Sequence, residues 1–170
     1  MEQPTSSAKL IIVCGLPGSG KTTYARQLQT ARPSIRLCPD EWMGALSIDI
    51  WDEEKRAKIE ALQWQLGQRL LALGLTVILE WGTWARSERD TLRLRARELG
   101  ATVELHYLPA SPGVLLDRIQ RRGIEDPPIS REQLLQWANA FQPPTAEEQA
   151  LFDKAVTLNS GMGQSSEGPS

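Results

Sequence analysis

The segment at residues 15–22, GLPGSGKT, constrains what this chain can fold into more than any other stretch. It follows the apolar run LIIVC and precedes a helical pattern, so it forms the turn between a strand and a helix. Its spacing is G-x-x-x-x-G-K-[ST]. The glycines let successive backbone N–H groups face one point, and the following helix adds the positive end of its dipole. The sequence therefore predicts an anion-binding loop at the carboxyl end of a first strand.

The same spacing assigns roles to the side chains of the loop. Lys21 is expected to reach the β- and γ-phosphates of a nucleotide and to be catalytic, and the Thr22 hydroxyl is expected to bind Mg²⁺. The residues predicted to contact the nucleotide here are Gly15, Pro17, Gly18, Ser19, Gly20, Lys21, Thr22 and Thr23.

Strand patterns alternate with helical ones along the rest of the chain. Apolar or β-branched runs predict strands at 9–14, 34–38, 75–79, 102–108 and 155–158, and the segments between most of them show helical spacing or capping signals. This alternation is typical of βαβ units. It predicts an α/β fold of three layers, in which a five-stranded parallel sheet is flanked by helices.

One domain is expected, over residues 9–158, because no linker-like stretch interrupts it. A short helical lid is expected at about 121–141, where a basic stretch is followed by glycine, aspartate and two prolines. Residues 1–8 are expected to be flexible, and the small polar tail at 159–170 is expected to be disordered.

Several helix starts carry capping signals. Ser111, Ser130 and Thr145 each precede a helical pattern, and Ser87 begins SERD, a capping-box pattern. Arg86 and Arg89, in the helix that follows Ser87, could line the acceptor side of the site, but they are expected on the solvated surface of that helix.

Composition narrows the class of protein. The 170 residues carry a net charge of -2, which disfavours a dedicated nucleic-acid binder, although a local basic groove can exist within an acidic total. No stretch approaches the roughly 18 consecutive apolar residues of a membrane span, and no signal-peptide core is present, so the cytoplasm is the expected location and no membrane partner is expected. Cys14 and Cys38 are expected to be buried thiols and not a disulfide or a zinc site.

The run LIIVCGLPGSGKTTYAR resembles the small P-loop kinases related to polynucleotide kinases, zeta toxins and chloramphenicol phosphotransferases. The resemblance extends over about residues 9–158, and outside the loop it depends on short motifs. It implies an ATP-dependent phosphotransferase, with ATP and Mg²⁺ as cofactors.

The motif CPDEWM, just after the second strand, carries the resemblance further. In this group an aspartate at that place usually serves as general base for the acceptor hydroxyl, which implies that role for Asp40; the alternative is a turn or helix-cap aspartate. Polynucleotide kinases often place a phosphate-binding arginine three residues later. Here that position is Met43, which disfavours a phosphorylated nucleic-acid acceptor.

The motif LLDRIQRRG places Arg118 and Arg122 on one helical face. The resemblance implies that Arg118 packs on adenine and that Arg122 is catalytic and contacts the transferred phosphate, with Arg121 as the competing choice. The alternative is a solvated basic helix end.

The motif ILEWGTWARSERD follows the third strand. Glu80 could hold Mg²⁺ through water or contact the acceptor, or be a simple strand-end carboxylate. Trp81 and Trp84, with Trp42, could form an aromatic wall around an organic acceptor, or could pack against helices.

These features predict transfer of the γ-phosphate of ATP to a hydroxyl of a small organic acceptor, by a monomer or homodimer. One alternative is a polynucleotide or nucleoside 5'-hydroxyl kinase. Another is a nucleotide-binding regulatory protein with weak ATPase activity, which would keep the loop but need no acceptor site.

Overall fold

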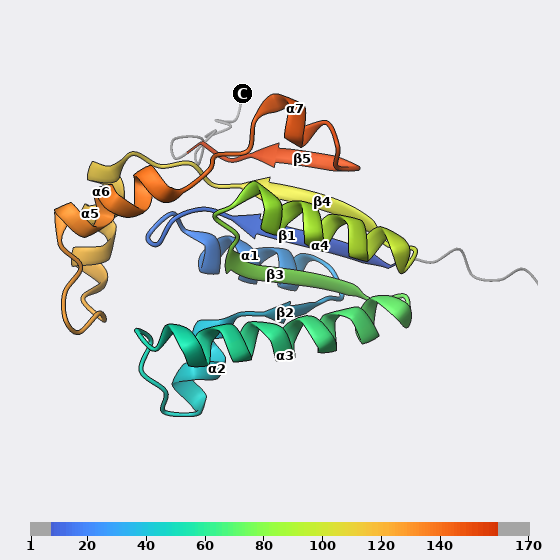
Figure 1. Ribbon diagram of the computed structural model, residues 1–170, viewed down its shortest axis with the longest axis horizontal. Coiled ribbons are helices and arrows are strands. Elements are labelled where there is room, and N and C mark those ends of the chain that lie inside the picture. The colour runs from blue at the N-terminus through green and yellow to red at the C-terminus, as the bar shows by residue number, and fades with distance from the viewer. Residues whose placement is uncertain (1–7, 160–170) are drawn as a thin grey trace, which may run out of the picture.

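The computed structural model describes residues 8–159 and confirms the predicted fold class. Five parallel strands form one sheet in the order β2-β3-β1-β4-β5, with helices on both faces (Figure 1). The strands are β1 (Lys9–Cys14), β2 (Ile35–Leu37), β3 (Thr76–Gly82), β4 (Thr102–Tyr107) and β5 (Lys154–Thr157). The helices are α1 (Lys21–Ala31), α2 (Pro39–Ala45), α3 (Glu53–Ala72), α4 (Arg86–Glu98), α5 (Pro112–Arg122), α6 (Arg131–Ala140) and α7 (Ala146–Gln149).

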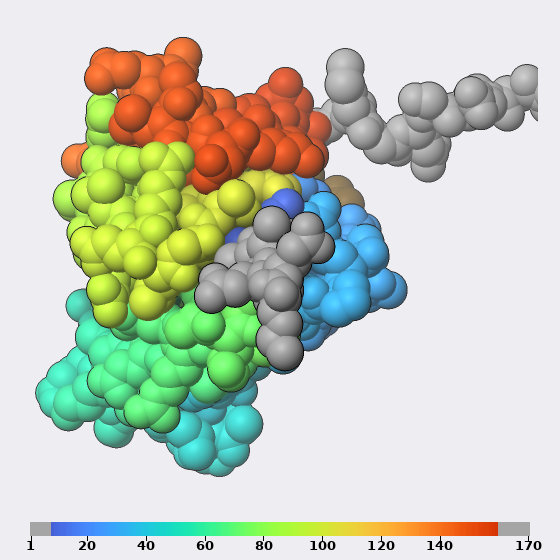
Figure 2. Space-filling view, turned by 90° about the vertical axis from the view of Figure 1, so that its right-hand side faces the viewer, coloured from blue at the N-terminus to red at the C-terminus, as the bar shows by residue number. Residues whose placement is uncertain are grey.

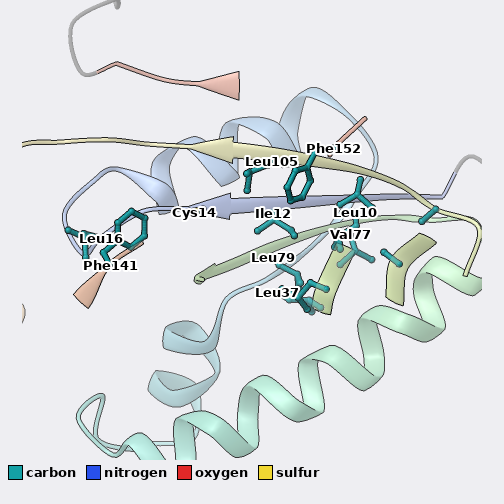
Figure 3. Close-up of a cluster of buried hydrophobic side chains, with 14 of the residues drawn as sticks. Leu10, Ile12, Cys14, Leu16, Leu37, Val77, Leu79, Leu105, Phe141 and Phe152 are labelled. Carbon is teal, nitrogen blue, oxygen red and sulfur yellow. The ribbon is translucent and has the colours of Figure 1, made fainter. Parts of the chain in front are cut away.

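The sheet separates two apolar cores. Successive side chains of a strand point to opposite faces, so Leu10 and Ile12 of β1 join the larger core, and Ile11 and Val13 join the smaller one, under α1. Figure 3 shows the larger core, where strand residues meet Phe141 and Phe152. Because both faces are covered, β1 is apolar almost throughout, as parallel strands generally are.

The strand order sets the position of the site. From β1 the chain passes by α1 to β2 on one side, and from β3 it crosses to β4 on the other side of β1. Open α/β sheets bind ligands at such a reversal, beyond the carboxyl ends of the strands. Figure 1 shows that the loop after β1, α2 and the pair α5 and α6 all lie at this end. Figure 2 shows the opposite end, with α4 (yellow-green) and α1 (blue) on either side.

Three predicted caps are confirmed, and one is wrong. The side chains of Ser111, Ser130 and Thr145 accept hydrogen bonds from backbone N–H groups of α5, α6 and α7. Ser87, in contrast, lies inside α4, which begins one residue earlier at Arg86. The helix is capped instead from inside its first turn, where the Glu88 carboxylate accepts a hydrogen bond of 2.8 Å from the N–H of Ala85.

Helix α2 was not predicted. It begins at Pro39, and β2 ends at Leu37, so only Cys38 separates the strand from the helix. Proline is favoured at the first helical position, because its missing N–H would have no partner there. Asp40 therefore lies in the first turn of a helix.

Cys14 and Cys38 are both free and buried, as predicted, and burial raises the pKa of each thiol to about 11. Within residues 8–159, no helix is both long and apolar enough to cross a membrane. Of the segments expected to be flexible or disordered, 1–8 and 159–170, residues 1–7 and 160–170 lie outside the described residues. Ala8 is described, and it is buried.

Candidate active site

The loop after β1 has the backbone conformation that its glycines were predicted to allow. Gly18 has a φ of +81°, and a Cβ atom there would lie 2.9 Å from Cγ1 of Ile119 and 3.0 Å from the carbonyl oxygen of Leu115. Position 18 therefore requires glycine both for its backbone angle and for its contact with α5. Gly15 is anchored to the end of β3 by its N–H, which donates to the carbonyl of Gly82 (3.3 Å).

The loop leaves polar groups available to an anion. Gly20 precedes α1 and has no side chain to cap the first turn, whose N–H groups lack an intrahelical partner. The Ser19 hydroxyl is buried and has no hydrogen-bond partner within residues 8–159. Such an orphaned donor beside a helix N-terminus fits a bound phosphate. Pro17 lies in the turn itself, and Thr23 is exposed on α1.

Lys21 is half-buried, and its Nζ donates to the carbonyl of Leu16 (3.0 Å). Burial lowers the pKa of Lys21, and the negative charges of Glu80 and then Asp40 oppose that effect. The positive charge of Arg122 adds to the lowering. The two predicted carboxylates and the predicted arginine therefore all act on the same lysine.

Thr22 and Glu80, predicted separately from the sequence, are in contact. The Thr22 hydroxyl donates to Oε1 of Glu80, and Oε2 accepts a 2.7 Å hydrogen bond from Nη1 of Arg36. Glu80 is buried, with 3% of its side chain exposed. Arg36 was not predicted as a site residue.

The oxygens of Thr22 and Glu80 fit Mg²⁺, which prefers hard oxygen ligands and usually binds through one or two protein groups together with phosphates and water. No cluster of three or more His, Cys, Asp or Glu able to hold a metal occurs among the described residues. A metal here would accordingly take most of its remaining ligands from the nucleotide and from water.

Asp40 lies in the first turn of α2, and 65% of its side chain is exposed. It forms an ion pair with Nη2 of Arg56, from α3, which also approaches the carbonyl of Ile50 (3.4 Å). Met43 is completely buried, so it provides no surface for a substrate. The positive charge beside Asp40 is therefore that of Arg56, and the sequence does not indicate this pairing between two helices.

The three predicted tryptophans are partly buried and pack against the larger core. The Nε1–H of Trp81 donates to Oε1 of Gln63 (2.9 Å), and the Trp84 ring lies 6.0 Å from that of Trp137. Packing thus accounts for these contacts, and a role in an acceptor wall stays a prediction for Trp42, Trp81 and Trp84.

Trp51, which the sequence did not single out, connects the two sides of the site. Its ring stacks on Trp137 of α6 at a centroid distance of 6.1 Å, and its Nε1–H donates to the carbonyl of Asp126 (3.1 Å). The α2–α3 loop is thereby joined to the segment where a lid was expected.

The three arginines at the end of α5 differ in their surroundings. Nη1 of Arg118 lies 3.4 Å from the carbonyls of Gly18 and Ser19, beside the loop. Arg121 is 79% exposed and pairs with Asp117, whereas Arg122 pairs with Glu125. The positive charge of Arg122 lowers the pKa of Lys21.

A pocket of about 420 Å³ adjoins the loop on the side of Arg118. Tyr24 lies in its wall, and its hydroxyl is 2.7 Å from Nδ1 of His106. Burial lowers the pKa of His106, which favours the neutral ring. Because the Glu104 carboxylate 2.8 Å from Nε2 is an acceptor, the tautomer with the proton on Nε2 fits these contacts, and Nδ1 then accepts from Tyr24. The pocket is lined by Ser19, Gly20, Thr23, Tyr24, Gln27, Leu108, Arg118, Leu158 and Asn159.

A larger hollow, of about 500 Å³, is lined only by residues of α1. It contains none of the glycines, carboxylates or α5 arginines of the site.

The expectation for Arg89 is wrong. Its side chain is fully buried and forms an ion pair with Glu148. Its guanidinium also donates to the backbone carbonyls of Thr83 (2.7 Å), Trp84 (3.3 Å) and Gln142 (2.8 Å). It therefore fastens the loop after β3, which follows Glu80, to the segment after α6.

A family profile described as an AAA domain matches residues 10–144, most of the chain. The chain belongs to this AAA-domain family. Among curated proteins, none matches the sequence closely.

Solved structures resemble this AAA domain over nearly its full length. A protein from Chloroflexus aurantiacus inferred to be a kinase has a TM-score of 0.70 and 23% identity, over 90% of this chain and 88% of that one. Chaetomium thermophilum Kti12, in complex with ADP-AlF3, has a TM-score of 0.65 and 21% identity, over 91% of each chain. A gluconokinase from Sinorhizobium meliloti has a TM-score of 0.56 and 21% identity, over 92% of this chain and 85% of that one. At these identities the likeness shows a common fold, and it confirms the predicted resemblance to P-loop kinases.

Proposed function

We propose that this AAA-domain protein transfers the terminal phosphoryl group of ATP to a hydroxyl of a small organic acceptor, with Mg²⁺. The observation that supports this most is the contact between Thr22, at the end of the phosphate-binding loop, and the buried carboxylate of Glu80. Lys21 adjoins Thr22 in the same loop. Burial lowers its pKa, Glu80 and Asp40 oppose that effect, and Arg122 reinforces it. A general base, a metal-binding carboxylate and a phosphate-binding lysine at one end of the sheet are the parts that phosphoryl transfer needs.

In this proposal, the loop N–H groups, the Ser19 hydroxyl and Lys21 bind the triphosphate, and the pocket beside Arg118 receives the base. Asp40 orients the acceptor hydroxyl and takes its proton. The acceptor oxygen forms a bond to the γ-phosphorus while the bond to the bridging oxygen breaks, and ADP leaves. Thr22 and Glu80 would hold Mg²⁺, which neutralises charge on the phosphates.

The segment 121–141 serves as the lid. Arg122 now pairs with Glu125, and that pair would exchange for the transferred phosphate when the lid closes over a bound nucleotide. A guanidinium suits this role because it forks onto phosphate oxygens. Closure would also exclude water, which favours transfer over hydrolysis.

The experiment is a screen for ATP consumption with pools of hydroxyl-bearing metabolites, using Lys21→Ala as the blank. We expect acceptor-dependent ADP release from the natural protein and none from the variant. In Asp40→Asn, transfer should fall far more than ATP affinity, because the base acts only on the acceptor.

The screen also separates the alternatives. Phosphorylation of oligonucleotides only, with binding that weakens steeply with salt, would indicate a polynucleotide kinase. ATP hydrolysis that no acceptor stimulates would indicate the regulatory protein. An unchanged rate in Lys21→Ala would exclude phosphoryl transfer at this loop.

A further inference from the structure

Arg36 is a buried cation in the middle of the shortest strand, and only 7% of its side chain is exposed. In the sheet it lies beside Ile78, which belongs to the apolar core under α1. Glu80 follows Ile78 by two residues and so points to the same face. Strand register thus brings Arg36 and Glu80 together under the helix that carries Thr22.

Arg36 contacts two carboxylates that belong to different parts of the site. Nη1 donates to Oε2 of Glu80 at 2.7 Å, and Nη2 pairs with Oε1 of Glu41. The third nitrogen of the guanidinium, Nε, donates to Oε1 of Gln29 at 3.3 Å. Glu41 is the neighbour of Asp40 in the first turn of α2.

These contacts determine how Glu80 can be oriented. A buried carboxylate needs a partner, because its charge has lost the solvation of water. Since Arg36 occupies Oε2, the oxygen left for Thr22 is Oε1. The same guanidinium holds Glu41, so the start of α2 is fixed relative to the end of β3.

We propose that Arg36 is a positioning residue, which holds the Glu80 carboxylate against Thr22 and fastens the first turn of α2, with Asp40, to the phosphate-binding end of the sheet. This inference rests on the proposed function, because it assigns Arg36 to the same metal and acceptor site. It predicts that the response to Mg²⁺ depends on Arg36.

The test measures binding of the non-hydrolysable analogue AMP-PNP by calorimetry, without metal and across a Mg²⁺ titration. Arg36→Lys keeps the charge but loses the fork that joins two carboxylates. We expect the Mg²⁺ concentration for half-maximal enhancement to rise about tenfold or more, as is typical when a partner of a metal ligand is removed. Affinity without metal should stay within about twofold, since Arg36 does not belong to the loop.

Arg26→Ala is the matched control. Arg26 also pairs with Glu41, at 2.9 Å, but it is exposed and does not contact Glu80. Its Mg²⁺ response should equal that of the natural protein. If Arg36→Lys does not fold, the double variant Arg36→Met with Glu80→Gln removes the unpaired buried charge at position 80, and its AMP-PNP binding should be enhanced by Mg²⁺ much less than that of the natural protein.

The possible failures are distinguishable. If the natural protein binds AMP-PNP with a Mg²⁺ response that Arg36→Lys retains, the inference about Arg36 is overturned and the proposed function stands. If the double variant retains that response, the inference is overturned together with the assignment of Glu80 to Mg²⁺, while phosphoryl transfer at the loop stands. Equal losses with and without metal also overturn the inference, because they indicate general damage. If the natural protein binds no nucleotide, both are overturned.

Discussion

Replacing Arg89 by methionine is expected to destabilise the protein by about 3–5 kcal/mol, the usual cost of removing one partner of a buried ion pair. Glu148 would keep its charge in a site where the side chains of the pair are 0% and 1% exposed. Three backbone carbonyls, those of Thr83, Trp84 and Gln142, would also lose a donor. These carbonyls place the expected loss toward the upper end of that range.

The assay is reversible unfolding in urea, followed by circular dichroism, together with thermal unfolding. For a chain of this size, the same loss corresponds to a fall in Tm of roughly 6–20 °C. Arg95→Ala is the control on the same helix, because the Arg95–Glu98 pair is exposed and should contribute no more than about 1 kcal/mol.

A second variant tests the physical cause. Adding Glu148→Leu to Arg89→Met removes the unpaired charge, so it should restore part of the lost stability and leave the cost of the three carbonyls. If Arg89→Met loses less than about 1 kcal/mol, or no more than Arg95→Ala, the buried pair does not hold the loop after β3 as described.

Three further predictions concern the site. Burial lowers the pKa of Lys21 below 10.5, so ATP binding in alkaline solution should protonate this lysine, and calorimetry in buffers of different ionisation enthalpy measures the proton uptake. Between the pKa of Lys21 in the folded protein and 10.5, the unfolded chain binds more protons, so the stability of the free protein should rise with pH there. The Thr83 hydroxyl is buried without a partner among residues 8–159, so Thr83→Val should raise unfolding stability by about 1 kcal/mol, and a loss would mean that water or a ligand satisfies it. Trp51→Ala removes the stack on Trp137 and should speed tryptic cleavage after Arg122 several-fold, whereas Trp51→Phe should cleave more slowly than Trp51→Ala; equal rates for all three proteins would show that Trp51 does not restrain this segment.

The fold could be predicted because its signals are local. The apolar run of β1, the glycines of the loop and the caps at Ser111 and Ser130 each act within a few residues. Helix α2 escaped prediction because it is short and follows β2 almost directly. Ser87 was assigned as a cap from its spacing to Asp90, but Glu88 reaches back to Ala85 and begins the helix earlier.

The site could be predicted only in part, for the same reason. Lys21, Thr22 and Glu80 were found from the motif or from a strand end. Arg36 and Arg89 were not, because their carboxylate partners are 44 and 59 positions away in the sequence. An arginine in a short strand or a polar helix has the pattern of a surface residue, and only the register of the sheet and the packing of α4 bury it.

The contact at Gly18 has a mechanical consequence. With no space for a Cβ atom between this glycine and Ile119, the helix that carries Arg118 and Arg122 rests directly on the backbone of the loop. Small displacements of the loop by an incoming triphosphate would be transmitted to both arginines through the Ile119 side chain and the Leu115 carbonyl of the same helix. A smaller residue at position 119 would not make room for a side chain at position 18, because the Leu115 carbonyl oxygen and the left-handed backbone angle would still oppose it.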